Sequence, residues 1–505
     1  MTRLLCIGHA PLPHEPSRLL CSGSLRTWHF VKPLLDAGHE VRLVAARVPG
    51  SGGDESTSIL ERRDGRLHYF SAGFEHFEDD HFLRGHLEEF DPDAVVGINN
   101  YPSSRAARLP TDVPLWCDLN GWAMAEAQTK AVTHGDDLYL AHFWNMERAI
   151  LDRADVVSSV SEAQAHAVVG ELASRGRLGR QTVGYDFCRT IPNALLEPYG
   201  AHDASRVGAE GGGAPPKIRG ALVPHGAFVL LWSGGYNTWT DVDLLVEALC
   251  RAMDALDDLH FVSTGGALPG HDELTFERFR RRVAGRGFDD RLHFTGWLPT
   301  PEVPHYYAAA DLGLNIDRRC YEATYGARNR INDMVAGGLP MLTTLGTEVS
   351  RHLASRDLVI GSAIGDVDAF VDAILDARGR RDALRAMAGR ARRYARREFS
   401  YAKTTRPLVA WAEAPRRAPD RGRAVDLDPS VDLFHASPTM VKDRRRAADG
   451  DLWSNPSESA ERRCRRLEAQ LDEITGSRFF RLWMRWVKIR RALPGGLNRG
   501  DAPAR

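Results

Sequence analysis

The chain has 505 residues, with 66 Lys and Arg against 67 Asp and Glu, which leaves a formal net charge of −1. This length predicts two α/β domains with additional segments, and the balanced charge gives no reason to expect a nucleic acid partner. Seven cysteines occur without a CxxC pair, so neither a disulfide framework nor a zinc site is predicted. The sequence shows no signal peptide and no apolar run of about 18 residues, so we expect a cytoplasmic protein.

The beginning of the chain predicts a Rossmann-like domain. Residues 3–10 predict a buried strand, 26–39 a helix and 40–46 a second strand. The Pro- and Gly-rich loop before the helix carries Gly23 and Ser24, where a ligand can lie; the alternative is an ordinary turn between strand and helix. Because no GxGxxG motif is present, the loop does not indicate a dinucleotide site.

Two further strands are predicted within residues 90–100 and 113–128. The second strand ends at Asp118, and Asn120 follows it. Since ligands bind at the carboxyl ends of parallel strands, we expect both strand ends to face a cleft between the domains. The alternative is that Asn120 begins a turn and that Asp118 caps a helix.

A second Rossmann-like domain is predicted after a linker. Residues 200–220 are rich in Gly, Pro and Ala and lack hydrophobic periodicity, which is typical of a linker. Residues 227–233 then predict a buried strand, followed by the glycine pair Gly234 and Gly235 with Asn237 in the same loop. A glycine pair between a strand and a helix favours a backbone cradle for phosphate.

The segment 311–344 predicts a strand, a loop, a helix and a strand, which is one βαβ unit. The loop carries Glu322 and Gly326, and the helix is predicted over 327–336. The helix start would direct free backbone N–H groups and its positive dipole end towards a ligand at the strand ends. An anionic ligand is therefore predicted here.

Two arginines, Arg328 and Arg330, stand in the first turn of this helix. No Lys occurs from 218 to 402, so a phosphate clamp in this domain would have to use arginine, which binds phosphate with two hydrogen bonds. The alternative for Arg330 is a surface ion pair with Asp333, three residues on, worth about 0.3 kcal/mol.

These residues resemble the donor-binding segment of retaining glycosyltransferases with the GT-B fold, in particular glycosyltransferase family 4, or glycosyl transferases group 1. Aligning on the Ala-Gly-Gly-Leu-Pro run at 336–340 places Asp333 at the second acidic position of the family pattern. Tyr325 stands where the family has its first acid, and Glu322 lies three residues earlier. The run from Gly296 to Asp311 is also similar to the family, and the resemblance extends over about 1–412.

The resemblance implies a GT-B fold of two Rossmann-like doubly wound domains that face a cleft, and it implies roles for individual residues. Glu322 and Asp118 would be catalytic residues, with Glu322 in contact with the transferred sugar and Asp118 ordering the acceptor. Asp333 would hold the nucleotide ribose. The other implied donor-binding residues are Gly234, Gly235, Asn237, Gly326, Arg328 and Arg330, and the implied acceptor-binding residues are Gly23, Ser24 and Asn120.

The implied activity is transfer of a sugar from a nucleotide-sugar to a glycan or lipid-linked glycan, with retention, in cell-surface polysaccharide biosynthesis. Such enzymes need no metal or other cofactor, because a helix dipole and cationic side chains stabilise the departing diphosphate. One alternative is a nucleotide-sugar epimerase of the same fold. Another is a non-catalytic module that binds a glycan or recruits a partner. Family 4 members usually have a lysine in the donor domain, and its absence here, with the displaced Glu322, would favour this alternative.

The boundaries that we predict are an acceptor-side domain at 1–199, a linker at 200–220, a donor domain at 221–395 and a closing helix at 396–414. A flexible linker at 415–455 and a helical tail at 456–492 would follow. Within 478–491 aromatic and basic residues separate on a helical wheel and no acid occurs, which is typical of a helix that lies on an anionic membrane surface. The alternative is a helix docked on this protein or on a second subunit.

Overall fold

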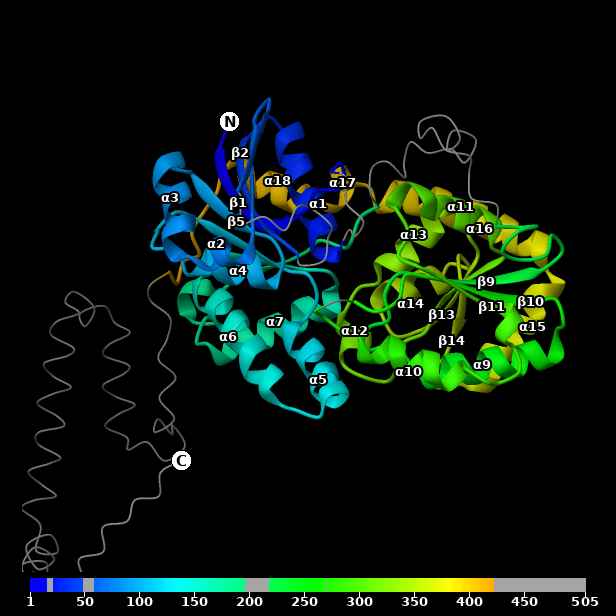
Figure 1. Cartoon of the computed structure of the whole chain (residues 1–505). Coiled ribbons are helices and arrows are strands. Elements are labelled where there is room, and N and C mark those ends of the chain that lie inside the picture. The colour runs from blue at the N-terminus through cyan, green and yellow to red at the C-terminus, as the bar shows by residue number, and fades with distance from the viewer. Residues whose placement is uncertain (16–20, 49–58, 196–217, 269, 422–505) are drawn as a thin grey trace, which may run out of the picture. The chain divides into compact units, whose positions relative to one another are not determined.

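The computed structural model describes residues 1–15, 21–48, 59–195, 218–268 and 270–421, all of which belong to one compact unit. Within these residues the strands form two separate sheets, one of eight strands and one of six (Figure 1). Each sheet is built from successive strand and helix segments, as the alternating pattern in the sequence predicts.

The first domain contains the eight-stranded sheet. Its strands are β1 (Arg3–Ala10), β2 (Glu40–Arg47), β3 (Leu60–Asp64), β4 (Leu67–Ala72), β5 (Ala94–Gly97), β6 (Leu115–Leu119), β7 (Val156–Ser159) and β8 (Cys188–Thr190). Their order is β3-β4-β2-β1-β5-β6-β7-β8, and every pairing is parallel except that of β3 with β4. Strand addition changes direction beside β1, so loops leaving β1 and β5 diverge and leave room for a ligand.

The helices of the first domain connect these strands. They are α1 (Ser22–Asp36), α2 (Phe74–Glu78), α3 (Asp80–Phe90), α4 (Asn100–Ala107), α5 (Ala123–His134), α6 (Leu138–Arg153) and α7 (Glu162–Ser174), with a 3-10 turn η1 (Arg180–Thr182). The Ser161 hydroxyl caps α7 by accepting a hydrogen bond from the Gln164 amide at 3.1 Å. Gly135 ends α5 in the left-handed conformation, with φ of 69°, so that α5 and α6 form a hairpin.

The second domain contains the six-stranded sheet. Its strands are β9 (Phe228–Ser233), β10 (Leu259–Thr264), β11 (Leu292–Gly296), β12 (Leu312–Asn315), β13 (Met341–Thr344) and β14 (Ile360–Ser362). All of its pairings are parallel, and the order is β11-β10-β9-β12-β13-β14. The direction of strand addition changes beside β9, as it does beside β1. Two Rossmann-like domains with this shared topology constitute the predicted GT-B fold.

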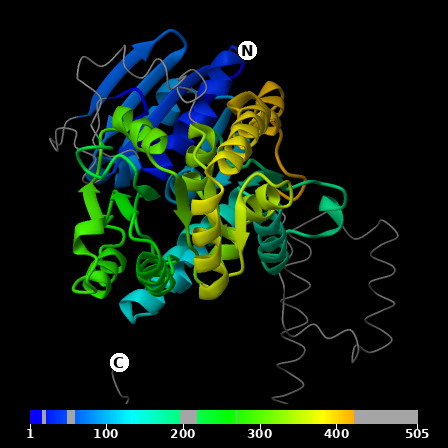
Figure 2. The same cartoon turned by 90° about the vertical axis from the view of Figure 1, so that its right-hand side faces the viewer.

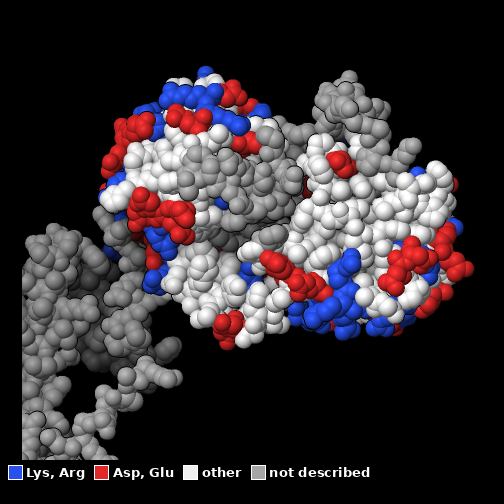
Figure 3. All heavy atoms as spheres, in the orientation of Figure 1, with Lys and Arg blue, Asp and Glu red and all other residues white. Residues whose placement is uncertain are grey.

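The helices of the second domain are α9 (Val242–Ala255), α10 (Leu274–Val283), α11 (Val303–Ala309), α12 (Glu322–Tyr325), α13 (Asn329–Gly337), α14 (Glu348–Ala354), α15 (Val367–Gly379) and α16 (Arg381–Glu398), with 3-10 turns η2 (Asp289–Arg291) and η3 (Thr300–Glu302). Asp241 caps α9 by accepting from the Leu244 amide at 3.0 Å. Lys and Arg side chains gather over α10, as Figure 3 shows.

After α16 the chain returns to the first domain through α17 (Tyr401–Thr404) and α18 (Arg406–Glu413). Figure 2 shows these helices, drawn in orange, beside the blue elements of the first domain. The Thr2 hydroxyl donates to the Ala412 carbonyl at 2.7 Å, and the rings of Trp116 and Trp411 meet edge to face at 5.5 Å. Part of the first core is therefore built from the end of the described chain.

Each sheet packs an apolar cluster on both of its faces. In the second domain one cluster joins β9, β10 and β12 to α9 and α15, and the other joins the same sheet to α13 and α16. In the first domain α1 and α18 cover one face, and α6 and α7 contribute to the other. Burial on both faces explains why the central strands are continuous apolar runs in the sequence.

The structure differs from the predicted elements in several places. Helix α1 begins at Ser22 rather than at 26, β3 and β4 were not predicted, and residues 123–128 begin α5 rather than extend a strand. The predicted linker 200–220 ends early, because Ile218 is buried and Arg219 pairs with Asp311 in the second domain.

The predicted flexible linker at 415–455 also begins too early. Ala418 is buried in the first core, and its amide donates to the Asp155 carboxylate at 2.8 Å. The Asp420 carboxylate accepts from the buried guanidinium of Arg177. Residues 415–421 therefore pack on the first domain. The predicted helical tail at 456–492 lies outside the described residues.

Candidate active site

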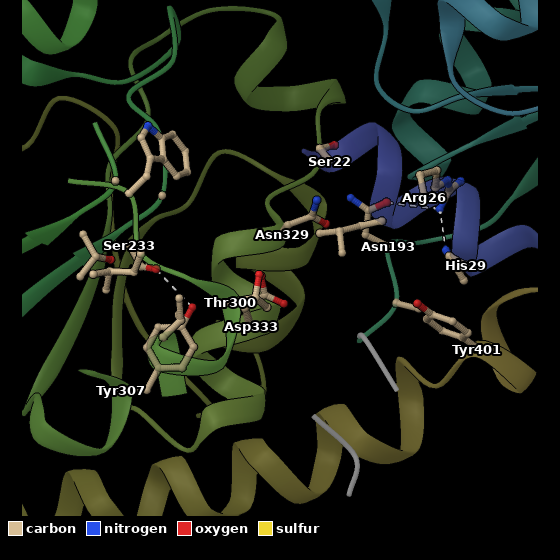
Figure 4. Close-up of a pocket in the computed structure, with 18 residues that line it drawn as sticks. Ser22, Arg26, His29, Asn193, Ser233, Thr300, Tyr307, Asn329, Asp333 and Tyr401 are labelled. Carbon is tan, nitrogen blue, oxygen red and sulfur yellow. Dashed lines mark hydrogen bonds between the residues drawn. The ribbon is translucent and has the colours of Figure 1, made fainter. Parts of the chain in front are cut away.

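A pocket opens where the carboxyl ends of the two sheets face each other (Figure 4). On the first-domain side it is lined by the beginning of α1 and by Asn193, and Tyr401 of α17 completes that wall. On the second-domain side it is lined by the loops after β9, β10 and β11 and by side chains of α11 and α13. Both topological switch points therefore contribute to one pocket.

The α13 wall presents Asn329 and Asp333, which lie one turn apart on the same face of the helix (Figure 4). Asp333 is the only carboxylate among the described residues that line this pocket, and burial raises its pKa to about 7. Beside it the hydroxyls of Tyr307 and Ser233 share a hydrogen bond of 3.2 Å. The ionised carboxylate of Asp333 is therefore destabilised by burial, and a ligand that donates a hydrogen bond to it would offset this cost.

The turn after β9 is formed by Gly234 and Gly235, and Arg330 lies beneath it. Gly234 has a φ of 91°, which favours glycine, and it lines the pocket. Arg330 Nε donates to the Ser233 carbonyl at 2.6 Å, Arg330 Nη2 donates to the Gly235 carbonyl, and the guanidinium lies 3.8 Å from the centroid of Trp232. No carboxylate of a described residue pairs with Arg330, and no described residue bonds its Nη1. The turn therefore has an uncompensated positive charge beneath it.

Arg328 differs from its expected role. It is 5% exposed, and its Nε donates to Asp317 at 2.8 Å while Nη1 and Nη2 donate to the two carboxylate oxygens of Glu322. It does not line the pocket. Two carboxylates already compensate its charge, so Arg328 is not placed here to bind an anion, and its predicted donor-binding role stays a prediction.

Glu322 lies in α12 rather than in an open loop. Burial raises its pKa to about 7, although the Arg328 guanidinium opposes this effect. A Cβ added at Gly326 would lie 2.0 Å from Glu322 Oε1, so only glycine allows the backbone to pass this carboxylate. Glu322 and Arg328 thus support the Gly326 turn from inside the domain and do not line the pocket.

On the first-domain side, Gly23 and Ser24 belong to the first turn of α1, not to the loop that the sequence predicts. Ser24 is fully buried, and Ser22 lines the pocket instead. Asn120 Nδ2 donates to Ser22 Oγ at 3.1 Å and to Asn99 Oδ1 at 2.9 Å, and Asn99 Nδ2 donates to the Gly23 carbonyl at 3.0 Å. The predicted residues come together, but as supports for Ser22.

Asp118 was predicted to face the cleft, but in the structure it does not line the pocket. It is fully buried, and both of its carboxylate oxygens accept hydrogen bonds from Arg26, at 3.0 and 2.7 Å. The Ser158 hydroxyl donates a third hydrogen bond at 2.7 Å. A carboxylate in a central strand must be paired in this way, so Asp118 holds Arg26, which reaches the pocket wall.

Several pocket residues were not predicted from the sequence. Arg26 and His29 lie one turn apart on α1, and this spacing after a first strand is a signal that could have identified them. Arg26 Nη1 donates to Asn193 Oδ1 at 3.2 Å. Trp297 and Tyr401 come from distant segments, and no local pattern marks them. Asn237, by contrast, lies outside the pocket.

Within the described ranges, no group of three His, Cys, Asp or Glu side chains is placed to hold a metal ion. In the same ranges, no helix combines the length and the apolar character that crossing a membrane requires.

Two family models match the chain. The glycosyl transferase 4-like domain matches residues 23–178, and the glycosyl transferase-like model matches residues 248–410. Together they span well over half of the chain, one on each Rossmann-like domain. A comparison with curated proteins found no match. The chain belongs to the glycosyltransferases of the GT-B fold, with domains of the family 4 and group 1 kinds.

Solved GT-B structures are similar to this chain in fold. Sucrose-phosphate synthase from Thermosynechococcus elongatus matches with a TM-score of 0.60 at 14% identity, over 82% of this chain and 98% of that one. HepE from Anabaena, in complex with UDP-glucose, matches with a TM-score of 0.56 at 14% identity, over 82% of this chain and 100% of that one. The α,α-trehalose 6-phosphate synthase from Burkholderia multivorans matches with a TM-score of 0.60 at 12% identity, over 82% of this chain and 99% of that one.

Proposed function

We propose that this glycosyltransferase moves a sugar from a nucleotide-sugar to a glycan acceptor, with retention of the anomeric configuration. One observation carries the proposal: the half-buried carboxylate of Asp333 and the Gly234 turn, which the Arg330 guanidinium supports, line the same pocket at the switch point of the donor domain. A nucleotide diphosphate offers the matching groups, namely ribose hydroxyls to donate to a carboxylate and a diphosphate to face a cation.

In this proposal the ribose donates to Asp333 and the base lies against Trp297, which is 38% exposed in the pocket wall. Tyr307 packs behind the ribose site through its bond to Ser233. UDP-glucose in the similar HepE structure supports a uridine nucleotide as the first donor to test.

The diphosphate would lie at the glycine turn after β9 and at the beginning of α13. The α13 N-terminus contributes free N–H groups and the positive end of its dipole, and Arg330 contributes the charge that a family lysine would otherwise supply. Developing charge on the departing diphosphate is stabilised by these fixed groups, so we propose that no metal is required. EDTA should then leave the rate unchanged, and a rate that falls with EDTA and returns with Mg²⁺ would contradict this step.

We assign Glu322 a positioning role, because its oxygens are bonded to Arg328. It would hold the Gly326 turn, whose backbone faces the transferred sugar, rather than touch the sugar itself. Glu322→Gln removes one charge while keeping the shape, and it should lower kcat more than it raises KM for the donor. Equal and small effects on both constants would favour the non-catalytic alternative.

Incubation with a panel of UDP-, GDP- and ADP-sugars tests the proposed function. Slow hydrolysis of one nucleotide-sugar, or transfer of its sugar to a glycan with an unchanged anomeric configuration, supports it. Formation of an epimeric nucleotide-sugar supports the epimerase alternative. Absence of turnover together with glycan binding supports a non-catalytic module. Thermal shift screening identifies the nucleotide first, since a ligand at 100 times its Kd stabilises by about 2.7 kcal/mol.

We also propose that the segment 478–491 attaches the enzyme to an anionic membrane surface, beside acceptors used in cell-surface polysaccharide biosynthesis. The sequence carries this proposal: six basic residues are interspersed with Trp483, Trp486 and other apolar residues, with no acid between 478 and 491. Each Lys or Arg near such a surface contributes about 1 kcal/mol. Flotation with anionic and neutral liposomes, with a truncation after residue 421 as the comparison, tests it, and equal flotation of both forms would contradict it.

A further inference from the structure

A second pocket lies on the other side of the contact between the two domains. The α5–α6 hairpin forms most of it, and Tyr321, which directly precedes Glu322, closes it from the second domain. Its volume of about 500 Å³ falls within the ~300–1,000 Å³ range of ligand-binding pockets. None of the residues assigned above to the nucleotide-sugar lines it.

Aromatic and aliphatic side chains make up most of its surface. Trp122, Met124 and Val132 line it, and Tyr321 is 59% exposed although it is a large aromatic residue. Gln128 and Asp136 supply polar groups. Flat rings with a few hydrogen-bonding groups suit a sugar, since a sugar ring has apolar C–H faces and a rim of hydroxyls.

The charges in this pocket exclude a phosphorylated ligand. Asp136 and Asp137 stand at its rim, and none of the described residues that line it is Lys or Arg. A phosphate or diphosphate would meet like charge there without a compensating cation. The pocket therefore complements a neutral ligand and differs from the first pocket, which Arg26 lines and where Arg330 lies behind the Gly234 turn without a carboxylate partner.

The pocket is joined to the donor domain by direct contacts. The ring of Trp122 meets the ring of Tyr325 edge to face at 4.9 Å, and Tyr325 and Tyr321 stack at 6.3 Å. Trp122 Nε1 also donates to the Glu171 carboxylate at 3.0 Å, which fixes the orientation of the indole. A ligand in this pocket thus lies next to α12, the helix that begins with Glu322.

We propose that this pocket binds neutral sugar residues of the acceptor glycan. That the bound glycan is an acceptor rests on the proposed function, but binding of a glycan at the pocket can be measured without turnover. Tyr321 and Trp122 would form the stacking surfaces, and Gln128 and Asp136 would bond hydroxyl groups.

An array of neutral and anionic oligosaccharides, from disaccharides to pentasaccharides, tests the proposal with the full chain. We expect binding to at least one neutral oligosaccharide and a loss of about tenfold or more in Tyr321→Ala. Tyr321→Phe keeps the ring and should retain the affinity. Val183→Ala, at a residue 85% exposed and outside both pockets, is the matched surface control and should be unchanged.

Two further measurements separate this inference from the proposed function. Tyr321→Ala should leave UDP affinity and nucleotide-sugar hydrolysis unchanged, while it raises KM for a bound oligosaccharide acceptor. Absence of binding to every oligosaccharide, or binding that survives Tyr321→Ala, overturns the inference even if the hydrolysis persists. Binding of a neutral alkyl probe such as decanol, but of no oligosaccharide, at Tyr321 would assign the pocket to an alkyl chain and would also overturn it.

Discussion

The parallel strands of the two sheets follow the same order around β1 and β9, yet the arginines beside these switch points differ in whether a carboxylate compensates their charge. In the first domain Arg26 is matched by the buried carboxylate of Asp118. In the second domain Arg330 bonds only carbonyl oxygens among the described residues, while its neighbour Arg328 is shared by two carboxylates. Arg26 lines the pocket and Arg330 lies behind the Gly234 turn that lines it, but only Arg330, without a carboxylate partner, retains charge for an anion.

Breaking the compensated pair should have the largest effect, and the effect should be on stability. Asp118→Ala leaves the Arg26 charge buried without its partner, which costs about 3–5 kcal/mol. Chemical unfolding followed by fluorescence should show the loss. Asp93→Ala, at an exposed carboxylate that accepts a hydrogen bond from the Arg3 backbone amide, is the control and should cost about 1 kcal/mol or less. A loss below about 1 kcal/mol for Asp118→Ala would mean that Asp118 is not needed to compensate the buried charge of Arg26.

Removing the uncompensated cation should have a smaller effect, and the effect should be on binding. Arg330→Gln should weaken UDP binding by about 1.5–3 kcal/mol, as for the loss of a hydrogen bond to a charged group. Isothermal titration measures it. Arg281→Gln on the exposed side of α10 changes the net charge equally and controls for long-range effects. Unchanged UDP affinity in Arg330→Gln would place the diphosphate elsewhere.

The pH dependence should sharpen the comparison, since burial raises the pKa of Asp333 to about 7 from an ordinary value near 4. The folded protein then binds more protons than the unfolded chain between these values, so stability should fall as pH rises from about 4 to about 7. Asp333→Asn should flatten this slope by about 1 kcal/mol or more across the window. UDP affinity of the unchanged protein should rise over pH 6–8 as the carboxylate ionises. A slope identical in both proteins would contradict the raised pKa.

The smallest effect is expected at a contact between the domains. The Glu348 carboxylate accepts hydrogen bonds from the Glu162 and Ala163 amides, at 3.0 and 3.3 Å, at the beginning of α7. Glu348→Gln keeps an acceptor but removes the charge that the helix dipole favours, a loss of about 0.3–1 kcal/mol. It should raise KM for the donor slightly and leave the unfolding of each domain unchanged. A tenfold change would mean that this contact controls closure of the pocket.

Much of the fold could be predicted from the sequence, because strands buried on both faces are continuous apolar runs. Strands such as β1 and β12 are of this kind. Strand β3 was missed, since its residues are mostly exposed and charged and lie at the edge of the sheet. The start of α1 was missed because Pro and Gly nearby favour a loop, whereas Cys21 caps the helix with its sulfur.

The candidate site was less predictable, for a physical reason. The order of residues predicts which side chains follow a strand, and so Gly234 and Asp333 could be identified. It does not predict which charges meet, and the partners of Arg328 and Asp118 are decided by tertiary contacts. Trp297 and Tyr401 approach the pocket from segments far apart in the chain, so no local spacing marks them.

The return of the chain after α16 has a consequence for synthesis on the ribosome. The first domain is completed by Leu408, Ala412 and Ala418, more than 200 residues after β8. At elongation rates of ~5–20 residues per second, the first sheet would wait about 10–50 s for this part of its core. The second domain is contiguous in sequence and meets no such delay. The domain that is translated second can therefore finish folding before the domain that is translated first.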